Sequence, residues 1–469
     1  MFLTTVLPGL VLLGLVIFVH ELGHFFAAKA RGVRVIRFSL GMGPEMIGFT
    51  RGETRYAIAW VPLGGFVQMA GDSLSEDGSM PEGGPDEFLS HPWVGRLIIA
   101  IAGPLANLIF AFVAYFALGL TGFNLPDFAN VLGRVEQGSV AQVAGLAEGD
   151  RIVRVGDQVV GTWYDMAEGL SSVDTTQGVT MVIERADSTF DLALAPGGVA
   201  SLAHALEPPS SPAVVGSLLS GLPAYLAGLE EGDQILAVDG RTIQRFDEIS
   251  PALLGRAGQE VPFRIKRGSA VFEVAVKPAS DPTGASDRAI IGVEPQRGLT
   301  RKVSYPPLEA LRYATLQTAS GVAGTYSGLW LTITKFWSVR EQMGGPIYIA
   351  QMARDAAKKG LDWWLNMLGF INLAIMAFNL LPIPLLDGGH ITLALLQAVR
   401  GRAISGRAYL NFQKAGLIVV GTLFVFILAQ DVMRPIRRMQ AQQQTPRTTE
   451  NAPQDSVSPE SPPSAPATP

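Results

Sequence analysis

The sequence contains no cysteine among its 469 residues. Disulfide bonds and thiolate metal sites are therefore excluded, so any transition metal must be bound by histidine, aspartate or glutamate. A surplus of positive charge is lacking too, because 36 lysines and arginines stand against 41 acidic residues. Without that surplus the chain is poorly suited to neutralise phosphates, and nucleic acid is not an expected partner.

Charged residues are scarce, at 16% against 48% hydrophobic residues, and the apolar residues gather in four long blocks. Each block is long enough for a helix that crosses a bilayer, which takes about 20 residues. The blocks are residues 3–27, 97–119, 361–381 and 413–431. The first is expected to be a span and not a signal peptide, because no basic residue precedes Lys29 and no small-residue cleavage site follows.

Three other segments differ from these blocks in composition. Residues 33–70 alternate strand-forming runs with glycine and proline, which predicts a small sheet beside the membrane. Residues 306–340 are moderately apolar and are expected to form a helix on or against the membrane instead of a fifth span. Residues 440–469 are rich in glutamine, proline, serine and threonine, which predicts a disordered tail.

An internal repeat occupies the polar region between the second and third blocks. AGLAEGDRIVRVGD at residues 144–157 returns as AGLEEGDQILAVDG at residues 227–240. A spacing near 80 residues is too long for a solenoid unit and fits two copies of a small domain. The shared Ala-Gly-Leu-x-x-Gly-Asp core resembles that of bacterial PDZ domains. The alternative is a pair of β-rich modules that bind no ligand.

These patterns predict a multi-pass α-helical membrane protein with four transmembrane helices, a small membrane-associated β-region and two extracytoplasmic PDZ-like α+β domains. The expected divisions are an N-terminal membrane region, two PDZ-like domains, a linker with a membrane-associated helix, a C-terminal membrane region and a tail. In that order they cover residues 1–123, 124–207, 208–290, 291–360, 361–439 and 440–469.

The first block carries polar residues inside an apolar run, VIFVHELGHFFA at residues 16–27. On a helix, His20 and His24 lie one turn apart on the same face, so both imidazoles can bind one Zn²⁺. Glu21 lies beside them, where a carboxylate can act as the general base on water at the metal. Ionisable residues within a span are costly, and a bound metal compensates for them. The alternative is polar side chains that reach the interface or pair with another helix.

A catalytic zinc usually takes three protein ligands and leaves one position for water, so a further ligand is needed. The best candidate is Asp387 in NLLPIPLLDGGH, residues 379–390, where Pro382 and Pro384 interrupt the helix end. Irregular backbone at membrane depth is tolerated only inside protein or a water-filled cavity, which indicates a site. His390 is expected to pack or hydrogen bond near that site and not to bind the metal.

The basic residues predict an orientation. None precedes the first block, whereas seven lie between it and the second: Lys29, Arg31, Arg34, Arg37, Arg51, Arg55 and Arg96. By the positive-inside rule residues 28–96 are cytoplasmic and the repeats lie outside. With four spans, Asp387 reaches the depth of His20 near the cytoplasmic side, and a fifth span would separate them. Against the bias, three basic residues after the last block would lie outside: Arg434, Arg437 and Arg438.

Taken together, the motifs resemble the site-2 protease family of intramembrane zinc metalloproteases. The resemblance rests on His20-Glu21-Leu22-Gly23-His24, the segment from Asn379 to Gly388, the tandem repeats and three supporting motifs. These motifs are Gly103-Pro104-Leu105-Ala106-Asn107, Pro62-Leu63-Gly64-Gly65 and Gly345-Pro346-Ile347. The resemblance implies that His20, His24 and Asp387 bind Zn²⁺, that Glu21 is base and then proton donor, and that Asn379 contacts the substrate backbone.

The resemblance also implies a location and a substrate class. Such enzymes lie in the bacterial inner membrane and cleave single-pass membrane proteins within or near the transmembrane segment. Cleavage usually follows removal of the outer domain by another protease. Membrane-tethered anti-sigma factors and remnant signal peptides are the implied substrates, and the PDZ pair is implied to select them by size or by their trimmed end.

A substrate helix must unwind before it is cut, because its own hydrogen bonds shield each peptide bond. An exposed strand edge can hold the unwound segment by β-addition. The candidate edge is residues 55–61, RYAIAWV, which would bring Tyr56, Ile58 and Trp60 to the substrate.

Two other functions compete with proteolysis. A membrane-tethered PDZ adaptor would hold zinc in a structural site, which usually has four protein ligands, and the sequence offers three convincing ones. A zinc transporter or storage protein would show polar positions along a path, and the second and fourth blocks carry almost none. Proteolysis is therefore the function that the sequence favours.

Overall fold

The computed structural model describes most of the chain: residues 2–72, 83–174, 178–186, 188–196, 198–219, 221–280, 288–296, 298–340, 343–402 and 404–444. The chain forms two compact units. The larger is built mainly on Met1–Ser210 and Arg297–Ile436, and the smaller mainly on Ser211–Asp281 and Asp287–Gln296. Of the expected tail, residues 440–444 belong to the last helix, and residues 445–469 lie outside the described stretches.

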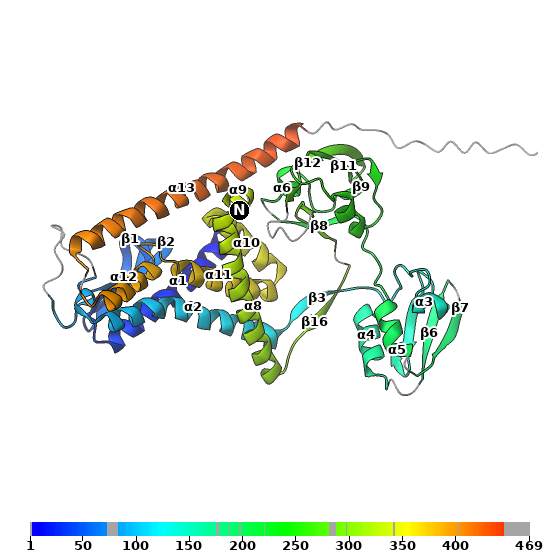
Figure 1. Ribbon diagram of the computed structural model, residues 1–469, viewed down its shortest axis with the longest axis horizontal. Coiled ribbons are helices and arrows are strands. Elements are labelled where there is room, and N and C mark those ends of the chain that lie inside the picture. The colour runs from blue at the N-terminus through cyan, green and yellow to red at the C-terminus, as the bar shows by residue number, and fades with distance from the viewer. Residues whose placement is uncertain are drawn as a thin grey trace, which may run out of the picture. The chain divides into compact units, whose positions relative to one another are not determined.

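Four helices of the described chain are long and apolar enough to cross a membrane, over Leu7–Ala30, Trp93–Thr121, Leu361–Asn379 and Gly406–Gln440. They belong to α1 (Phe2–Ala30), α2 (Trp93–Thr121), α11 (Leu361–Asn379) and α13 (Gly406–Gln444), as Figure 1 shows. Each of the four predicted spans thus coincides with a helix that is long and apolar enough to cross a membrane. The helix α8 (Pro307–Thr334), with 28 residues, is not among them and packs on α2 and α11.

An apolar core joins α1, α2 and α11 to the short helix α10 (Pro346–Lys359). Its buried members include Leu12 and Val16 of α1, Ala353 of α10, and Leu368 and Ile371 of α11. Because lipid is as apolar as these side chains, close van der Waals packing holds such helices together in a bilayer. The core therefore fixes α1 against α11, the two helices that carry or precede the polar motifs.

A buried ion pair ties α13 to the start of α10. Asp431 is 4% exposed and Arg434 5%, and their side chains lie 3.1 Å apart. The Asp431 carboxylate also accepts backbone N–H hydrogen bonds from Gly345, Ile347 and Tyr348, at 3.0, 3.0 and 3.2 Å. It thereby satisfies donors that a helix N-terminus leaves unpaired. Arg434, one of the three basic residues that oppose the predicted orientation, is neutralised by this pair.

The sheet predicted over residues 33–70 is present as two long strands, β1 (Val35–Arg51) and β2 (Thr54–Met69). Both strands bend, so the sheet consists of four strand segments side by side. Residues 37–40 pair with 65–68 on one side and with 55–58 on the other, and 55–58 pair in turn with 47–50. Residues 65–68 therefore form one outer edge of the sheet, and residues 47–50 form the other.

This pairing corrects the expected free edge. The predicted edge covers residues 55–61, but residues 55–58 have strand partners on both sides. Tyr56 stacks on Phe49 with ring centroids 5.2 Å apart, and Trp60 is 66% exposed on the outside of the sheet. The prediction failed because edge and interior strands look alike in sequence, and the bend of β1 decides which is which.

Two small β-domains follow α2. The first contains β4 (Arg151–Val155), β5 (Gln158–Val159), β6 (Val179–Arg185), β7 (Ser188–Leu194), α3 (Val140–Val143), α4 (Trp163–Ser172) and α5 (Gly198–Ala205). The second contains β9 (Gln234–Val238), β10 (Arg241–Thr242), β11 (Val261–Arg267), β12 (Ala270–Val276), α6 (Pro223–Leu226) and α7 (Ile249–Ala252). Their sheets have the same antiparallel order, β5-β4-β6-β7 and β10-β9-β11-β12.

Shorter elements complete the described chain. The ladder of β3 (Phe123–Asp127) and β16 (Leu299–Val303) joins the ends of α2 and α8 to the β-domains. The remaining elements are η1 (Phe88–Ser90), η2 (Phe246–Glu248), β8 (Val215–Leu218), β13 (Ala279–Ser280), β14 (Ala289–Ile290), β15 (Val293–Pro295), α9 (Phe336–Val339) and α12 (Asp387–Arg400). Of these, α12 and the turn before it carry the motif around Asp387.

The Gly-Asp pair of each repeat has a common structural role. Asp150 and Asp233 have side chains that are 0% exposed, and each binds an arginine of a strand in its own domain. Arg185 Nε lies 2.6 Å from Asp150, and Arg267 Nε lies 2.7 Å from Asp233. Each carboxylate also accepts a backbone N–H at 2.8 Å. The repeated motif therefore closes each domain around a hydrogen-bonded buried carboxylate.

Substitution Asp150→Asn should destabilise the first β-domain by about 2 kcal/mol, because it removes a charged hydrogen bond. Burial raises the pKa of Asp150, but the hydrogen bond from Arg185 and the N–H of Ala147 outweigh it and hold the pKa below its usual value. The ion pair thus stabilises the domain above the unfolded pKa, about 4, and is lost as pH falls through the folded pKa.

Limited proteolysis of the full chain between pH 7 and pH 3 measures this effect. The parent should become sensitive within residues 124–207 only at acidic pH, whereas Asp150→Asn should be sensitive already at neutral pH. Asp233→Asn is the matched change in the second domain and should leave the first domain protected. Equal protection of the parent and Asp150→Asn at pH 7 would contradict a stabilising role for the pair.

Candidate active site

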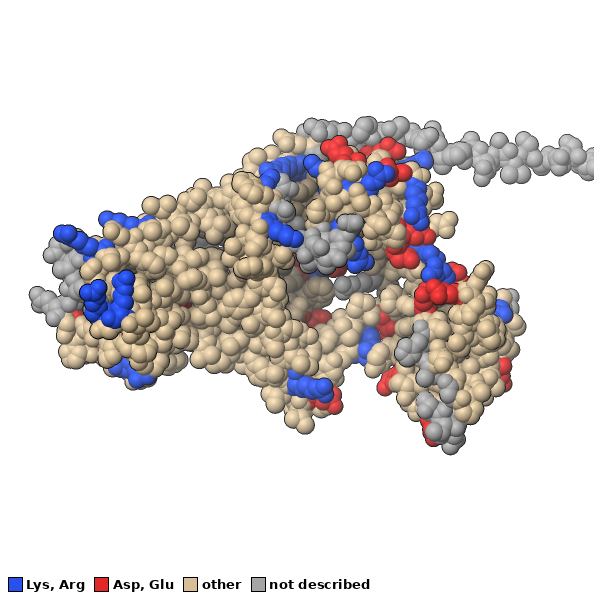
Figure 2. Space-filling view, viewed as in Figure 1, with Lys and Arg blue, Asp and Glu red and all other residues tan. Residues whose placement is uncertain are grey.

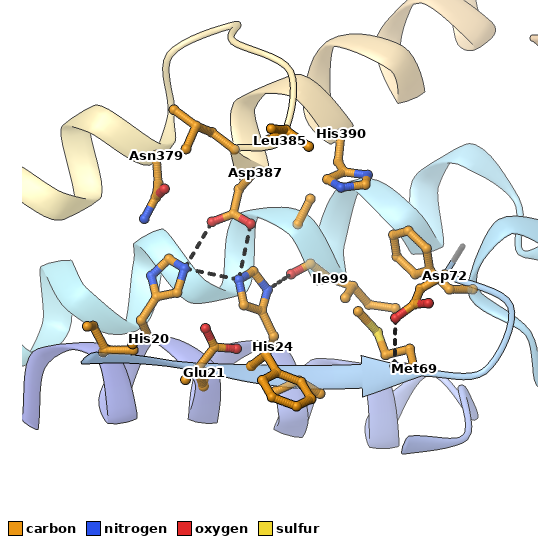
Figure 3. Close-up of a pocket in the computed structure, with 18 of the residues that line it drawn as sticks. His20, Glu21, His24, Met69, Asp72, Ile99, Asn379, Leu385, Asp387 and His390 are labelled. Atoms are coloured by element: carbon orange, nitrogen blue, oxygen red, sulfur yellow. Dashed lines mark hydrogen bonds and ion pairs between the residues drawn. The ribbon is translucent and has the colours of Figure 1, made fainter. Parts of the chain in front are cut away.

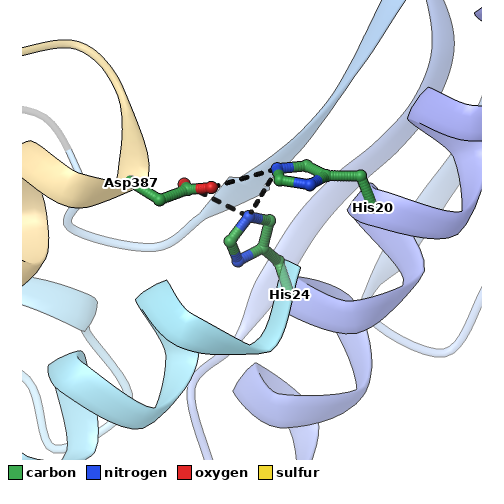
Figure 4. Close-up of side chains that lie close together, drawn as sticks. All are labelled: His20, His24 and Asp387. Carbon is green, nitrogen blue, oxygen red and sulfur yellow. Dashed lines mark hydrogen bonds and ion pairs between the residues drawn. The ribbon is translucent and has the colours of Figure 1, made fainter. Parts of the chain in front are cut away.

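The helix α1 carries His20 and His24, and the turn between α11 and α12 brings Asp387 to them (Figure 4). The Nε2 atoms of the two histidines lie 3.2 Å apart, and the Asp387 oxygens lie 3.0 Å from His20 Nε2 and 3.2 Å from His24 Nε2. The histidines are 7% and 8% exposed. All three side chains offer ligand atoms within 4.8 Å of one another, so they can surround one metal ion.

The helix α2 fixes the rings of both histidines at their Nδ1 atoms, on the side away from Asp387. His24 Nδ1 donates to the backbone carbonyl of Ile99 at 2.8 Å, which leaves Nε2 with a free lone pair toward Asp387. The amide of Asn107 lies 3.2 Å from His20 Nδ1. Between them, Gly103 makes room, because a Cβ there would collide with the imidazole of His24. These contacts were not predicted from the sequence, where the motif from Gly103 to Asn107 supported only the family resemblance.

A strained turn places Asp387 at the start of α12. The prolines before it prevent α11 from continuing. Leu385 has a φ of 73°, a left-handed conformation that is costly for leucine and that structures retain mainly at functional sites. A Cβ on Gly388 would collide with the backbone of Leu381, so only glycine lets the turn fold back on α12. The turn therefore aims the Asp387 carboxylate at the two imidazoles.

A cavity of about 580 Å³ opens beside the three side chains. Glu21 lines it next to the histidines, and Asn379 lines it from the end of α11 (Figure 3). His390 also lines the cavity, where its ring packs against Phe88 with centroids 5.9 Å apart, and it is not one of the three clustered ligands. The cavity can therefore hold several residues of a peptide chain against a carboxylate and a candidate metal site.

The outer edge of β2 forms one wall of this cavity. Gly65, Phe66, Val67 and Met69 line it, whereas Tyr56, Ile58 and Trp60 do not. The backbone N–H of Val67 interacts with the Glu21 carboxylate. The N–H of Met69 donates to Asp72 at 3.0 Å, where the strand ends (Figure 3). An edge with no second strand partner thus runs past the candidate base, which accepts its Val67 N–H, at residues that were not predicted from the sequence.

The donor set fits a zinc ion. Two imidazole nitrogens and a carboxylate oxygen are ligands that zinc prefers, and three protein ligands beside an open cavity are the usual pattern of a catalytic site. The Oδ2 atom of Asp387 is buried and has no hydrogen-bond partner among the described residues, only the His20 imidazole as an ionic contact. A cation between these groups would satisfy all of them.

Comparison with known protein families shows to which enzyme family the chain belongs. The model of Peptidase family M50 matches residues 8–425, which include the ligand cluster, Glu21 and the cavity. The chain belongs to peptidase family M50. An M50 peptidase uses zinc, so the cofactor is Zn²⁺, and the chain is a zinc metalloprotease.

Individual relatives agree with the family. The chain is 30% identical over 453 residues to the "Regulator of sigma-E protease RseP" of Escherichia coli strain K12, covering 92% of this chain and 99% of that protein. It is 30% identical over 443 residues to the protein of the same name from Salmonella typhimurium, covering 91% of this chain and 97% of that protein. With its four candidate spans, this M50 protein is an intramembrane protease of the bacterial inner membrane.

Proposed function

We propose that His20, His24 and Asp387 hold the zinc ion and that Glu21 is the base in peptide-bond hydrolysis. The observation that carries this assignment is the cluster itself, two buried histidines and a half-buried aspartate at 3.0–3.2 Å with a carboxylate beside them in one cavity. The PDZ adaptor with a structural zinc is set aside, because the fourth side of the cluster opens on the cavity instead of on another protein ligand.

The residues of the site divide the chemistry among them. Zinc, when bound, supplies a Lewis acid that activates water and stabilises charge on the scissile carbonyl. Glu21 takes the proton of the attacking water and passes it to the amide nitrogen as the C–N bond breaks. Asn379 has a carboxamide that can hydrogen bond to a substrate peptide group. Its place above His20 in Figure 3 supports that role.

The substrate is proposed to bind as an added strand on residues 65–68 of β2. This replaces the edge at 55–61, whose interior position rules out strand addition over 55–58. A transmembrane helix that unwinds here regains its hydrogen bonds from the open edge. The substrate would displace Glu21 from the N–H of Val67, whereas Asp72 keeps the N–H of Met69 and so marks the end of the edge. The peptide bond to be cut then lies near Val67 and Glu21.

Substitution Val67→Pro should lower cleavage by about 10-fold, the effect of losing roughly one backbone hydrogen bond to the segment that displaces Glu21 from the Val67 N–H. Proline removes the N–H that faces Glu21 and is tolerated on edge strands. Val67→Ala is the matched control, because it shortens the same side chain but keeps the N–H, and it should cleave at a rate near that of the parent.

The two variants are compared by the rate at which each cleaves a purified model substrate, and the zinc content of each variant is measured as well. Equal loss of cleavage in Val67→Pro and Val67→Ala would show that the valine side chain matters and not the strand edge. Loss of zinc in Val67→Pro would show damage to the metal site, and Gly65→Pro, which removes the next outward-facing N–H of the edge, would then be the test.

The two β-domains are proposed to be PDZ domains on the extracytoplasmic side of the membrane. Their common sheet order and the equivalent Asp150–Arg185 and Asp233–Arg267 pairs support a duplicated module. In this orientation residues 28–96 and the active site lie near the cytoplasmic side. The seven basic residues of that segment support it, whereas Arg434, Arg437 and Arg438 oppose it.

The proposed substrates are single-pass membrane proteins whose outer domain another protease has removed, such as membrane-tethered anti-sigma factors, or remnant signal peptides. The names of the relatives, regulators of sigma-E, support the first class. The test is a pair of single-pass substrates with the same transmembrane segment, one with and one without a folded outer domain. Only the truncated one should be cut, and equal cutting of both would contradict selection by size.

A further inference from the structure

Asn107 occupies a position that the reaction itself does not explain. It lies inside α2, is 0% exposed, and places its amide 3.2 Å from His20 Nδ1. Its other amide atom, Oδ1, is buried and has no hydrogen-bond partner among the described residues. A buried amide that leaves its carbonyl unpaired costs about 1–3 kcal/mol, so the position calls for a compensating role.

The chemistry of the neighbouring histidine supplies that role. A histidine that ligates a metal through Nε2 has no proton there, so its ring proton is on Nδ1 and needs an acceptor. The oxygen and nitrogen of an asparagine amide are assigned from their hydrogen bonds, and a half-turn of the amide exchanges them. After that half-turn, Oδ1 of Asn107 lies against Nδ1–H of His20 as the acceptor.

We infer that Asn107 is a positioning residue that accepts a hydrogen bond from His20 Nδ1–H and holds His20 in the tautomer that binds zinc. The inference rests on the proposed ligand role of His20. His24 has the same arrangement, with the carbonyl of Ile99 as acceptor at 2.8 Å. One face of α2 thus serves both histidines, since Ile99, Gly103 and Asn107 follow one another at four-residue steps.

A neutral amide suits this position better than the carboxylate that often supports a metal-bound histidine. At 0% exposure inside a predicted span, an added negative charge would carry a large desolvation cost. An amide also presents a donor or an acceptor to Nδ1 according to its rotation. Asn107 can therefore follow either tautomer of His20, although only the acceptor orientation favours the metal-binding form.

The test compares zinc affinity of the purified full chain in detergent among the parent, Asn107→Leu and Asn107→Asp, by competition with a chromophoric chelator. Asn107→Leu should bind zinc about 10–100-fold more weakly, the usual effect of losing such a partner. Asn107→Asp keeps an acceptor and should bind within about 10-fold of the parent or more tightly. Absorption of the cobalt-substituted protein should change in Asn107→Leu as the His20 ring reorients.

Asn372→Leu is the matched control. Asn372 is also 0% exposed in a membrane helix, but its amide donates to the carbonyl of Leu368 in its own helix, at 2.7 Å, and does not line the cavity. Its replacement should leave zinc affinity within about 3-fold, since it touches neither histidine. An equal loss in Asn372→Leu would overturn the inference, because buried polarity in general would then be responsible.

Other outcomes are equally decisive. Unchanged zinc affinity in a folded Asn107→Leu overturns the inference while leaving the metal site intact. If Asn107→Leu does not fold, Asn107→Ala takes its place, since it removes the amide without adding bulk or charge, and unchanged zinc affinity there overturns the inference. A parent that binds no zinc at all refutes the proposed ligand set, which is a separate failure.

Discussion

Substitution Glu21→Gln should leave zinc binding unchanged and lower cleavage by about 10²–10⁴-fold, the range that a positioned general base contributes. Glutamine has nearly the shape of glutamate, so the cavity and the contact with the edge strand at Val67 can persist. It cannot accept the proton of the attacking water or return it to the leaving nitrogen. Zinc content and cleavage of a single-pass substrate, measured on the same preparations, separate the two effects.

Two results would contradict this role for Glu21. Cleavage at more than about a tenth of the parental rate would show that another group takes the proton. Loss of zinc together with activity would show that Glu21 supports the metal instead of the reaction. Asp72→Asn is a useful control, because Asp72 lines the same cavity but lies at the far end of the strand edge, and it should keep both zinc and most of the activity.

Substitution Asp387→Asn should abolish zinc binding and activity together. Both Asp387 oxygens face imidazole nitrogens, at 3.0 and 3.2 Å, and the neutral amide supplies neither the charge nor two equivalent oxygens. Loss of a direct ligand should exceed the 10–100-fold that supporting partners are worth, so we expect zinc affinity to fall by more than about 100-fold. Zinc in excess should restore little activity, because the remaining two histidines do not complete the site.

The matched control for this variant is Asp362→Asn at the start of α11. Asp362 accepts hydrogen bonds from Asn124 at 3.2 Å and lies outside the cavity. It should bind zinc as the parent does. Full zinc occupancy in Asp387→Asn would contradict the ligand assignment and would direct attention to His390, the other histidine in the cavity.

The candidate spans and the cluster of possible metal ligands could be predicted from the sequence because each depends on local patterns. Length and apolarity define a crossing helix, and the spacing of His20 and His24 fixes their relation on α1 whatever surrounds them. Asp387 could be found because prolines break a helix at a depth where broken helices are rarely tolerated. The turn with Leu385 in a left-handed conformation is the structural counterpart of that signal.

The strand edge and the supporting contacts could not be predicted, because they arise from distant segments. Residues 55–58 are interior only because β1 bends and pairs with them twice, a long-range outcome that alternation of side chains does not encode. In the sequence Asn107 is only one polar residue in an apolar helix, and its contact with His20 arises from the packing of α2 on α1. The carbonyl of Ile99 has no sequence signal at all.

The most direct test of the account is to map the cut. A single-pass substrate without its outer domain would be incubated with the parent and with Glu21→Gln, and the product termini would be identified by mass spectrometry. The account predicts one cut within the hydrophobic segment, in the parent only and lost on chelation of zinc. A cut confined to the polar flanks, or one that persists in Glu21→Gln, would contradict it.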